Sequence, residues 1–212
     1  MDYIQIIELI AALLGILYLI LEVKASMWLW RVGVILPLFY IFLSWQSKVY
    51  GNIVVNLYYL ITSIWGWWLW SHRARRGSVE GGSAHEDPSE GIRLLRDFTG
   101  RVHCRTTLGV LMVCLLLPVA LWPLFLFITD SPQPLMDSIA TSMGFVGMWL
   151  LAKKYVENWF CFIISNALYA LLYFLQGYRI TALFFVVYTI LAVVGLVRWL
   201  RLYRRGQIHP KR

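Results

Sequence analysis

Residues 153–169, KKYVENWFCFIISNALY, match an earlier stretch, KASMWLWRVGVILPLFY at residues 24–40, at a constant offset of 129 residues. The same offset continues on both sides of the two stretches. The pairs it superposes are Gly15 and Gly144, Lys24 and Lys153, Trp30 and Trp159, Tyr40 and Tyr169, Tyr59 and Tyr188, Gly66 and Gly195, and Trp70 and Trp199. Because so many tryptophan, tyrosine and glycine pairs share one offset, the sequence predicts an internal duplication.

The composition places both copies in a membrane. Of the 212 residues 60% are hydrophobic and only 14% are charged, more apolar surface than a soluble core of this length could bury. Seven apolar runs each approach the roughly 20 residues that cross a bilayer as a helix. They lie at 3–23, 28–46, 52–70, 106–128, 135–152, 157–175 and 180–200. None alternates apolar with polar residues, as membrane barrel strands do, so we expect helices.

The number of runs explains how two copies are joined. A three-helix unit ends on the opposite side of the membrane from where it begins, so one extra helix lets the second copy keep the orientation of the first. The sequence therefore predicts an all-α integral membrane protein with seven transmembrane helices in a 3+1+3 parallel-repeat arrangement. The expected parts are a first three-helix bundle at 1–72, a cytoplasmic basic linker at 73–105, a linking transmembrane helix at 106–130, a second three-helix bundle at 131–203 and a cytoplasmic tail at 204–212. Parallel repeats of this kind typify transporters whose substrate site lies between the halves, near the midplane.

The net charge of +8 gives the orientation. Arginines crowd the linker between the third and fourth runs and the tail after the seventh, and Lys24, Lys153 and Lys154 fall on that same side. The positive-inside rule makes this side cytoplasmic and predicts an external N-terminus and a cytoplasmic C-terminus. Because topology accounts for the basic excess, it gives no support to nucleic-acid binding.

Polar side chains inside the apolar runs mark a candidate site. A polar group in lipid is unfavourable unless it is paired or faces a cavity. Asn56 and Tyr59 share one face of the third run, and Asn166 lies in the middle of the sixth. Interhelical hydrogen bonding remains the alternative for each asparagine. Trp30 and Trp159 lie near the cytoplasmic ends of their runs, where an aromatic belt at the headgroups is the alternative.

The residue types that drive other chemistries are missing from these runs. No Asp, Glu, Lys, Arg or His lies within the central two turns of any run, and the four histidines fall in loops or tails. The three cysteines are scattered and form no metal-ligand pattern. We therefore expect no enzyme activity, no cofactor and no metal. Because ion-coupled pumps usually keep an ionisable residue in the membrane, we expect uncoupled facilitated diffusion.

Several of these blocks carry a family resemblance. The stretch LYLILEVKASMWLWRVGVILPLFYIFLSWQSKVYGN, with KKYVENW and LQGY later in the chain, resembles the Pnu family of bacterial vitamin transporters. The resemblance implies a 3+1+3 fold similar in plan to the SWEET sugar transporters, homotrimers, and a location in the bacterial cytoplasmic (inner) membrane. It also implies uptake without ion coupling, with accumulation by a cytoplasmic kinase that phosphorylates the imported vitamin. The alternatives are a SWEET-like sugar facilitator and a non-transporting membrane subunit or intramembrane enzyme.

The resemblance also suggests roles for individual residues. Trp159 falls on the first tryptophan of the family's WxxW motif, whose ring is expected to stack on a flat heterocycle, and Phe162 replaces the second. Tyr188 matches a tyrosine near the polar part of the ligand. Asn56 stands where nicotinamide riboside transporters commonly carry Gln, whereas YLILE and WLWRVGVILP are more similar to the thiamine branch. The vitamin therefore stays open between thiamine, nicotinamide riboside and riboflavin. The candidate substrate-binding residues are Asn56, Tyr59, Trp159, Asn166 and Tyr188, with Trp30 and Tyr40 as weaker members.

Overall fold

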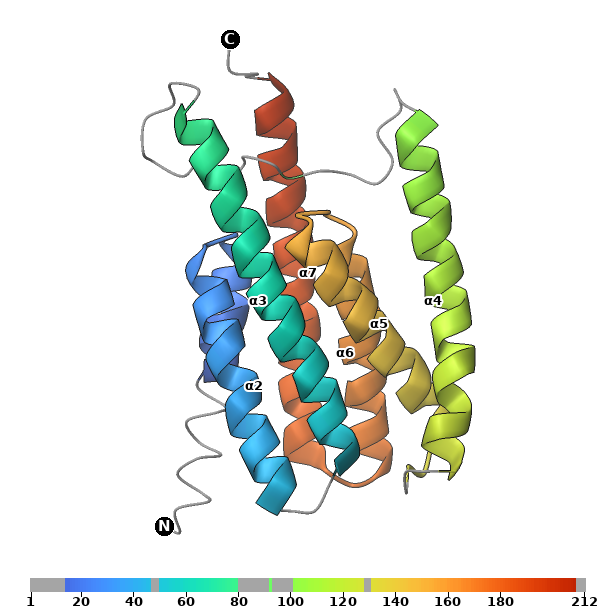
Figure 1. Ribbon diagram of the computed structural model, residues 1–212. Helices are drawn as coiled ribbons and strands as arrows, with labels where there is room; N and C mark the ends of the chain where they lie inside the picture. The colour runs from blue at the N-terminus through green and yellow to red at the C-terminus, as the bar shows by residue number, and fades with distance from the viewer. Residues whose placement is uncertain (1–13, 47–49, 80–91, 93–100, 128–130, 209–212) are drawn as a thin grey trace. The chain divides into compact units, whose positions relative to one another are not determined.

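The fold is all-helical. The computed structural model describes residues 14–46, 50–79, 92, 101–127 and 131–208. A first helix, Leu14–Val23, precedes the six labelled helices. These are α2 Trp28–Gln46, α3 Tyr50–Val79, α4 Arg101–Phe127, α5 Pro134–Ala152, α6 Asn158–Leu175 and α7 Arg179–Ile208 (Figure 1).

The helix ends differ from the sequence prediction mainly where the chain becomes polar. The bounds of α2 are those predicted, and α5 and α6 differ by one residue at their starts. Helix α3, however, continues to Val79, and α7 continues to Ile208, so both run into the segments predicted as linker and tail. Hydropathy marks only the part of a helix that fits the hydrocarbon layer, whereas arginine is a good helix former that lets the helix continue beyond it.

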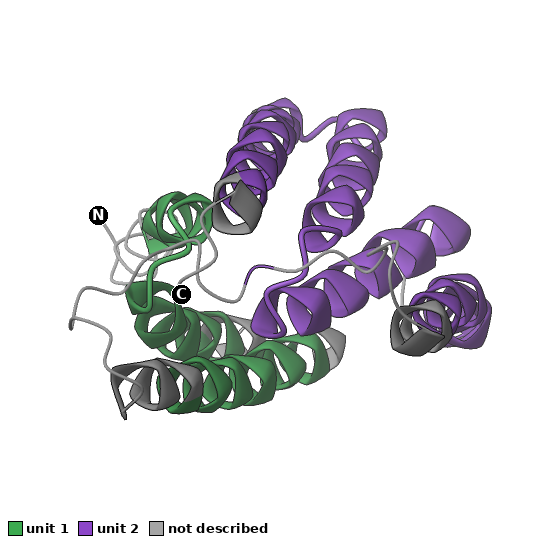
Figure 2. Cartoon of the chain, turned by 90° about the horizontal axis from the view of Figure 1, so that it is seen from above, with its two compact units in different colours: residues 1–90 green, residues 91–212 purple. Residues whose placement is uncertain are grey.

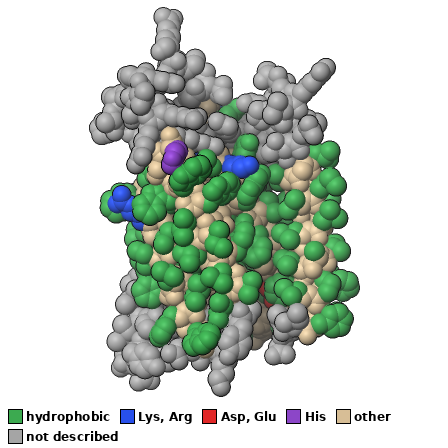
Figure 3. All heavy atoms as spheres, viewed as in Figure 1, with side chains coloured by type: hydrophobic (Ala, Val, Ile, Leu, Met, Phe, Trp, Pro, Cys, Tyr) green, Lys and Arg blue, Asp and Glu red, His purple; other side chains and the backbone are tan. Residues whose placement is uncertain are grey.

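Five helices are long and apolar enough to cross a membrane. They are Ile53–His72, Thr107–Phe127, Pro134–Ala152, Asn158–Leu175 and Thr181–Arg204. Leu14–Val23 and Trp28–Phe42 are apolar but shorter in their described parts, and most of the predicted 3–23 run lies outside the described residues. On the face drawn in Figure 3, hydrophobic side chains dominate the described surface, as expected of helices that face lipid.

The chain divides into two compact units, Met1–Glu90 and Gly91–Arg212 (Figure 2). In the first unit α2 packs against α3. In the second unit α5 packs against both α4 and α6, and α6 packs against α7. Helix α4, which was predicted as a separate linking helix, therefore packs with the helices of the second unit.

The same turn occurs once in each unit, at the offset found in the sequence. Ala25, at φ 53°, and Lys154, at φ 61°, are the non-glycine residues with left-handed backbone among those described. After each, the chain closes a six-residue loop by a hydrogen bond, from the Ser26 N–H to the Leu21 carbonyl at 3.0 Å and from the Tyr155 N–H to the Leu150 carbonyl at 3.0 Å. This is the Schellman helix ending. It turns the chain into α2 in one unit and into α6 in the other.

Candidate functional site

The two predicted stacking tryptophans lie in equivalent buried cores. The Trp30 ring covers Gly66 of α3 and meets the Trp70 ring edge-on, with centroids 5.3 Å apart at 82°. The Trp159 ring covers Gly195 of α7 and meets Trp199 at 5.7 Å and 81°. A Cβ atom on either glycine would overlap the ring above it. Both Trp30 and Trp159 have no exposed surface, so in this conformation the protein itself covers the ring that was predicted to stack on a ligand.

Phe162, the replacement in the WxxW pattern, packs on Gly147 of α5. The equivalent pair in the first unit has the two residue types exchanged, because the Tyr18 ring lies against Gly33 of α2. Each unit thus fills this space with one aromatic ring and leaves a glycine opposite it. Phe162 also lies edge-on to Trp159, at 6.4 Å and 73°. The position therefore contributes to helix packing in this conformation.

The remaining candidates in the second unit lie beside a group of five rings, here called the aromatic cluster. Its members are Tyr169 and Tyr173 on α6, Tyr178 between the helices, and Phe185 and Tyr188 on α7. Phe185 is central, with its centroid 5.2 Å from Tyr169, 5.3 Å from Tyr173 and 5.7 Å from Tyr188. Predicted residue Tyr188 therefore belongs to this cluster. Asn166, also predicted, lies three residues before Tyr169 on α6 and is partly buried.

Helix α5 holds the aromatic cluster through hydroxyl groups. The Thr141 and Tyr169 hydroxyls share a hydrogen bond of 2.8 Å. One turn away, the Ser165 hydroxyl donates to the Ala140 carbonyl at 2.8 Å. These bonds join α5 and α6 and satisfy polar groups that lipid could not. Some of the polar side chains of α6 therefore serve helix contact, the alternative that the sequence left open.

In the first unit the predicted residues occupy different environments. Asn56 on α3 is buried, with 7% of its surface exposed. Tyr59 is partly buried beside Tyr58, at a centroid distance of 5.8 Å. Tyr40 on α2 is 37% exposed. The structure therefore does not bring all seven candidates into one described cluster, and each unit contributes its own group.

Two buried polar residues were missed as candidates. Glu22 is only 2% exposed, and it lies within electrostatic range of Tyr18, as Tyr59 does. The sequence placed Glu22 near the end of its run, and it was set aside for that reason. Its position inside LYLILE, followed by the left-handed turn, was the available signal.

Asn158 is the second missed residue. Its side chain is fully buried, and neither its amide oxygen nor its amide nitrogen has a hydrogen-bond partner among the described residues. The equivalent position in the first unit is Leu29, also fully buried. The indole N–H groups of Trp30 and Trp159 are likewise buried without a partner within the described chain. Burying a polar group in this way is costly, which makes the asparagine unusual at a position where leucine fits.

The described residues contain no group of three or more His, Cys, Asp or Glu side chains placed to hold a metal ion. What the two units present is instead buried aromatic rings, isolated amides and single carboxylates. Such groups can bind and orient an organic ligand by stacking and hydrogen bonding.

Comparison with known proteins identifies the chain's relatives. Residues 5–201 match the nicotinamide mononucleotide transporter family. The chain therefore belongs to this family, and the resemblance to the Pnu transporters seen in the sequence is confirmed. It is similar to the nicotinamide riboside transporter PnuC of Escherichia coli (strain K12) and to that of Shigella flexneri. Each is 23% identical over 175 residues, which cover 73% of this chain and 68% of the relative.

The fold of this Pnu family member is also found in a solved structure. The chain is similar to the crystal structure of the vitamin B3 transporter PnuC with a TM-score of 0.66 and 21% identity, over 92% of this chain and 80% of the other. The all-helical, multi-pass membrane architecture expected from the sequence therefore agrees with the family.

Proposed function

We propose that this chain is a membrane transporter that takes up an unphosphorylated vitamin or vitamin precursor with a flat heterocycle, thiamine or nicotinamide riboside, by facilitated diffusion. The observation that carries the proposal is the family match over residues 5–201, which spans nearly all of the described helices. The vitamin transporters among its relatives support the substrate class. We place the chain in a bacterial cytoplasmic membrane, with the N-terminus outside and the C-terminus inside.

A 3+1+3 parallel repeat is the proposed architecture. Its support is the recurrence, 129 residues apart, of the left-handed turns at Ala25 and Lys154 and of the tryptophan rings over Gly66 and Gly195. Helix α4 lies between the two recurring segments in the chain. A substrate path between the two repeats follows from this arrangement.

The proposed substrate carries no phosphate. The family is described by a mononucleotide, whereas the bacterial relatives are named for the riboside, so the two differ by one phosphate group. In the described helices lysines and arginines lie near the ends, as Arg31 does in α2 and as Arg179 and Arg198 do in α7. A phosphate moving through the centre of these helices would lack the cation that usually stabilises it. Trapping by phosphorylation inside the cell is consistent with this selectivity, and we propose a cytoplasmic kinase as the functional partner.

The proposed site combines groups from both repeats. Asn56 and Asn166 would bond the edge of the heterocycle, Tyr59 and Tyr188 would close the site, and Trp30 and Tyr40 are weaker members. Trp159 can stack on a ligand only when its ring leaves Gly195, because α7 covers it in the described conformation. A movement of α6 relative to α7 would therefore accompany binding. We also propose a homotrimer, as the family resemblance implies.

Uptake into proteoliposomes that contain the purified chain tests the function. Radiolabelled thiamine, nicotinamide riboside and riboflavin are compared with their monophosphates and with glucose, without any ion gradient. We expect one free vitamin to equilibrate and its monophosphate to be excluded. Uptake of glucose alone would instead support the sugar facilitator. Failure of every free vitamin to enter would reject the proposal.

A further inference from the structure

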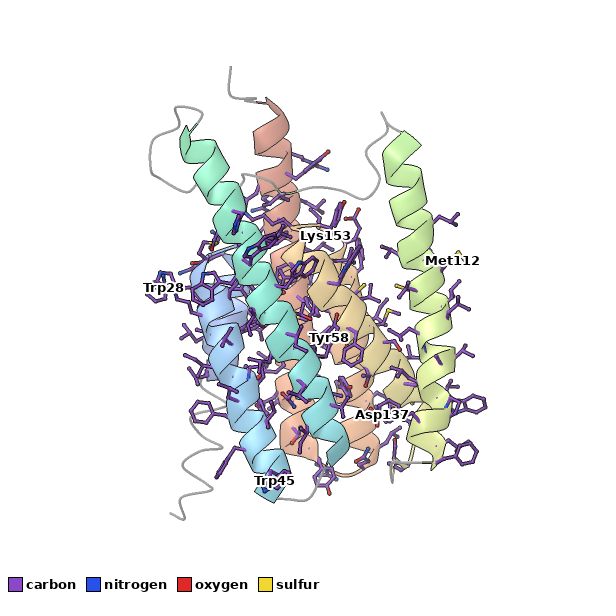
Figure 4. All side chains as sticks on the ribbon, viewed as in Figure 1. Trp28, Trp45, Tyr58, Met112, Asp137 and Lys153 are labelled. Atoms are coloured by element: carbon purple, nitrogen blue, oxygen red, sulfur yellow. The ribbon has the colours of Figure 1, made fainter. Side chains whose placement is uncertain are left out.

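Asp137 marks the end of the second unit that lies opposite its basic end. It is in the first turn of α5, whereas Lys153 directly follows the last turn of the same helix (Figure 4). Among the described residues of the unit, Asp137 is the one carboxylate at its end, and Arg179 at the start of α7 is the one cation there. Under the proposed orientation this end faces outward.

The Asp137 carboxylate is partly withdrawn from water. Its side chain is half-buried, and the Ser131 hydroxyl donates a hydrogen bond to it. Within the part of the chain that the structure describes, no lysine or arginine forms an ion pair with it. The carboxylate therefore keeps its charge uncompensated by a neighbouring cation while it is held in a fixed position.

Aromatic rings stand beside this carboxylate. Asp137 interacts electrostatically with Tyr173 on α6. The Tyr173 ring stacks on Phe185 at 5.3 Å and 15°, and its centroid lies 6.3 Å from Tyr178, which is 61% exposed. Electron-rich ring faces next to a carboxylate attract cations, most strongly flat ones that stack as well.

We propose that Asp137, Tyr173 and Tyr178 form an outer binding site for a flat organic cation, where the substrate first contacts the protein. This inference rests on the proposed function, since thiamine and nicotinamide riboside both carry a positively charged ring. It adds a residue and a charge requirement that the predicted site did not contain. A single fixed charge at the mouth of a path raises the local concentration of an oppositely charged ligand and its rate of association.

The outer site is continuous with the predicted one. Asp137 and Thr141 lie one turn apart on α5, and Thr141 pairs with Tyr169. Tyr169 contacts Phe185, which in turn contacts the predicted residue Tyr188. A cation that leaves Asp137 thus has a series of ring faces along the second unit on its way to Tyr188.

A purely structural role is the alternative for Asp137. An acidic residue in the first turn of a helix interacts favourably with the helix dipole, which would stabilise α5 without any ligand. The two roles differ in what they predict. A structural aspartate affects the melting temperature and acts equally on all substrates, whereas a binding aspartate affects cations only.

The test compares cationic substrates with uncharged analogues of the same shape. Initial uptake into proteoliposomes is measured for nicotinamide riboside against its dihydro form, and for thiamine against the analogue with thiophene in place of thiazolium. The variants are Asp137→Asn, which keeps the shape, Asp137→Glu, which keeps the charge, and Arg179→Gln, which removes a charge of opposite sign at the same end. Melting temperatures are recorded for all of them.

For Asp137→Asn we expect the KM of the cation to rise about three- to tenfold, with an unchanged maximal rate and a smaller effect at high salt. The uncharged analogue should be unaffected, Asp137→Glu should restore most of the affinity, and Arg179→Gln should not weaken binding. An unchanged cation KM at low salt, or an equal rise for the uncharged analogue, would overturn the inference while leaving the proposed function intact. If the wild-type chain takes up neither vitamin, the proposed function fails and the inference fails with it.

Discussion

The indole ring of Trp159 lies directly on Gly195, so that α6 and α7 approach each other where α7 has no side chain. Trp30 and Gly66 repeat this relationship between α2 and α3, 129 residues earlier. A large flat ring on a glycine allows close helix packing in a membrane, where small residues typically mark such contacts. The pairs therefore fix how the helices meet within each unit.

Enlarging either glycine should destabilise the protein. In Gly195→Ala and Gly66→Ala the new methyl group overlaps a fully buried tryptophan, which should cost about 1–3 kcal/mol through overpacking. Gly109 on α4 is a matched control, because a Cβ there meets no atom within 4 Å and Gly109→Ala only improves helix propensity. Thermal melting in detergent should show lower melting temperatures for the first two variants and no decrease for the third. Equal effects at all three glycines would contradict the packing argument.

The left-handed turns make the opposite prediction. A residue with a Cβ is strained at positive φ, so replacing Lys154 by glycine should stabilise the protein by about 1 kcal/mol. Ala25→Gly should act in the same direction, because it changes little except the backbone preference. Lys154→Ala is the control for loss of the lysine side chain, so the glycine variant should melt at a higher temperature than the alanine variant. A lower melting temperature for Lys154→Gly than for Lys154→Ala would show that the turn does not exist in this form.

The buried amide of Asn158 offers a third test. Because Leu29 fills the equivalent position in the first unit, Asn158→Leu should be accommodated and should raise stability by about 1–3 kcal/mol as the unpartnered amide is removed. The reverse change, Leu29→Asn, should destabilise by a similar amount. Both are read from melting curves in the same detergent. A clear loss of stability in Asn158→Leu would mean that the amide is satisfied in the dominant conformation.

Sequence reasoning predicted the helices of this protein well because apolar length is a direct physical requirement of the membrane. The bounds of α2 followed from that alone. The polar extensions of α3 and α7 did not, because hydropathy says nothing about helix outside the lipid. The offset between repeats carried more information than was used, since it paired Trp30 with Trp159 and also Gly66 with Gly195, and these four residues turned out to be packing partners.

The candidate site was harder to predict, for a different reason. A periodic pattern tells which face of a helix a residue occupies, but not which neighbouring helix covers that face. Trp159 was therefore predicted as an open stacking surface, although Gly195 covers its ring in the described conformation. Asp137 was passed over because it lies at the end of an apolar run, and only the structure places it beside Tyr173.

A fourth prediction separates ligand binding from helix contact at Asn56. The side chain is 7% exposed on α3, which fits either role. If Asn56 binds the heterocycle, Asn56→Leu should weaken vitamin binding by about tenfold, the effect of losing one buried hydrogen bond, with little change in melting temperature. Isothermal titration of the folded fraction gives the affinity. A fall in melting temperature with unchanged affinity would assign Asn56 to helix contact and remove it from the proposed site.

The last prediction concerns the energy source of uptake. Glu22 is the one buried carboxylate among the described residues, and a buried carboxylate is the kind of group through which a proton gradient could act. It lies near the end of the first described helix and within electrostatic range of Tyr18, rather than in the middle of a span. We therefore expect wild-type proteoliposomes to equilibrate the vitamin without concentrating it, whether or not a proton or sodium gradient is imposed. Glu22→Gln, which removes the ionisable group but keeps its size, should leave this insensitivity unchanged. Concentrative uptake that depends on the proton gradient in the wild type and disappears in Glu22→Gln would replace facilitated diffusion by proton coupling through Glu22.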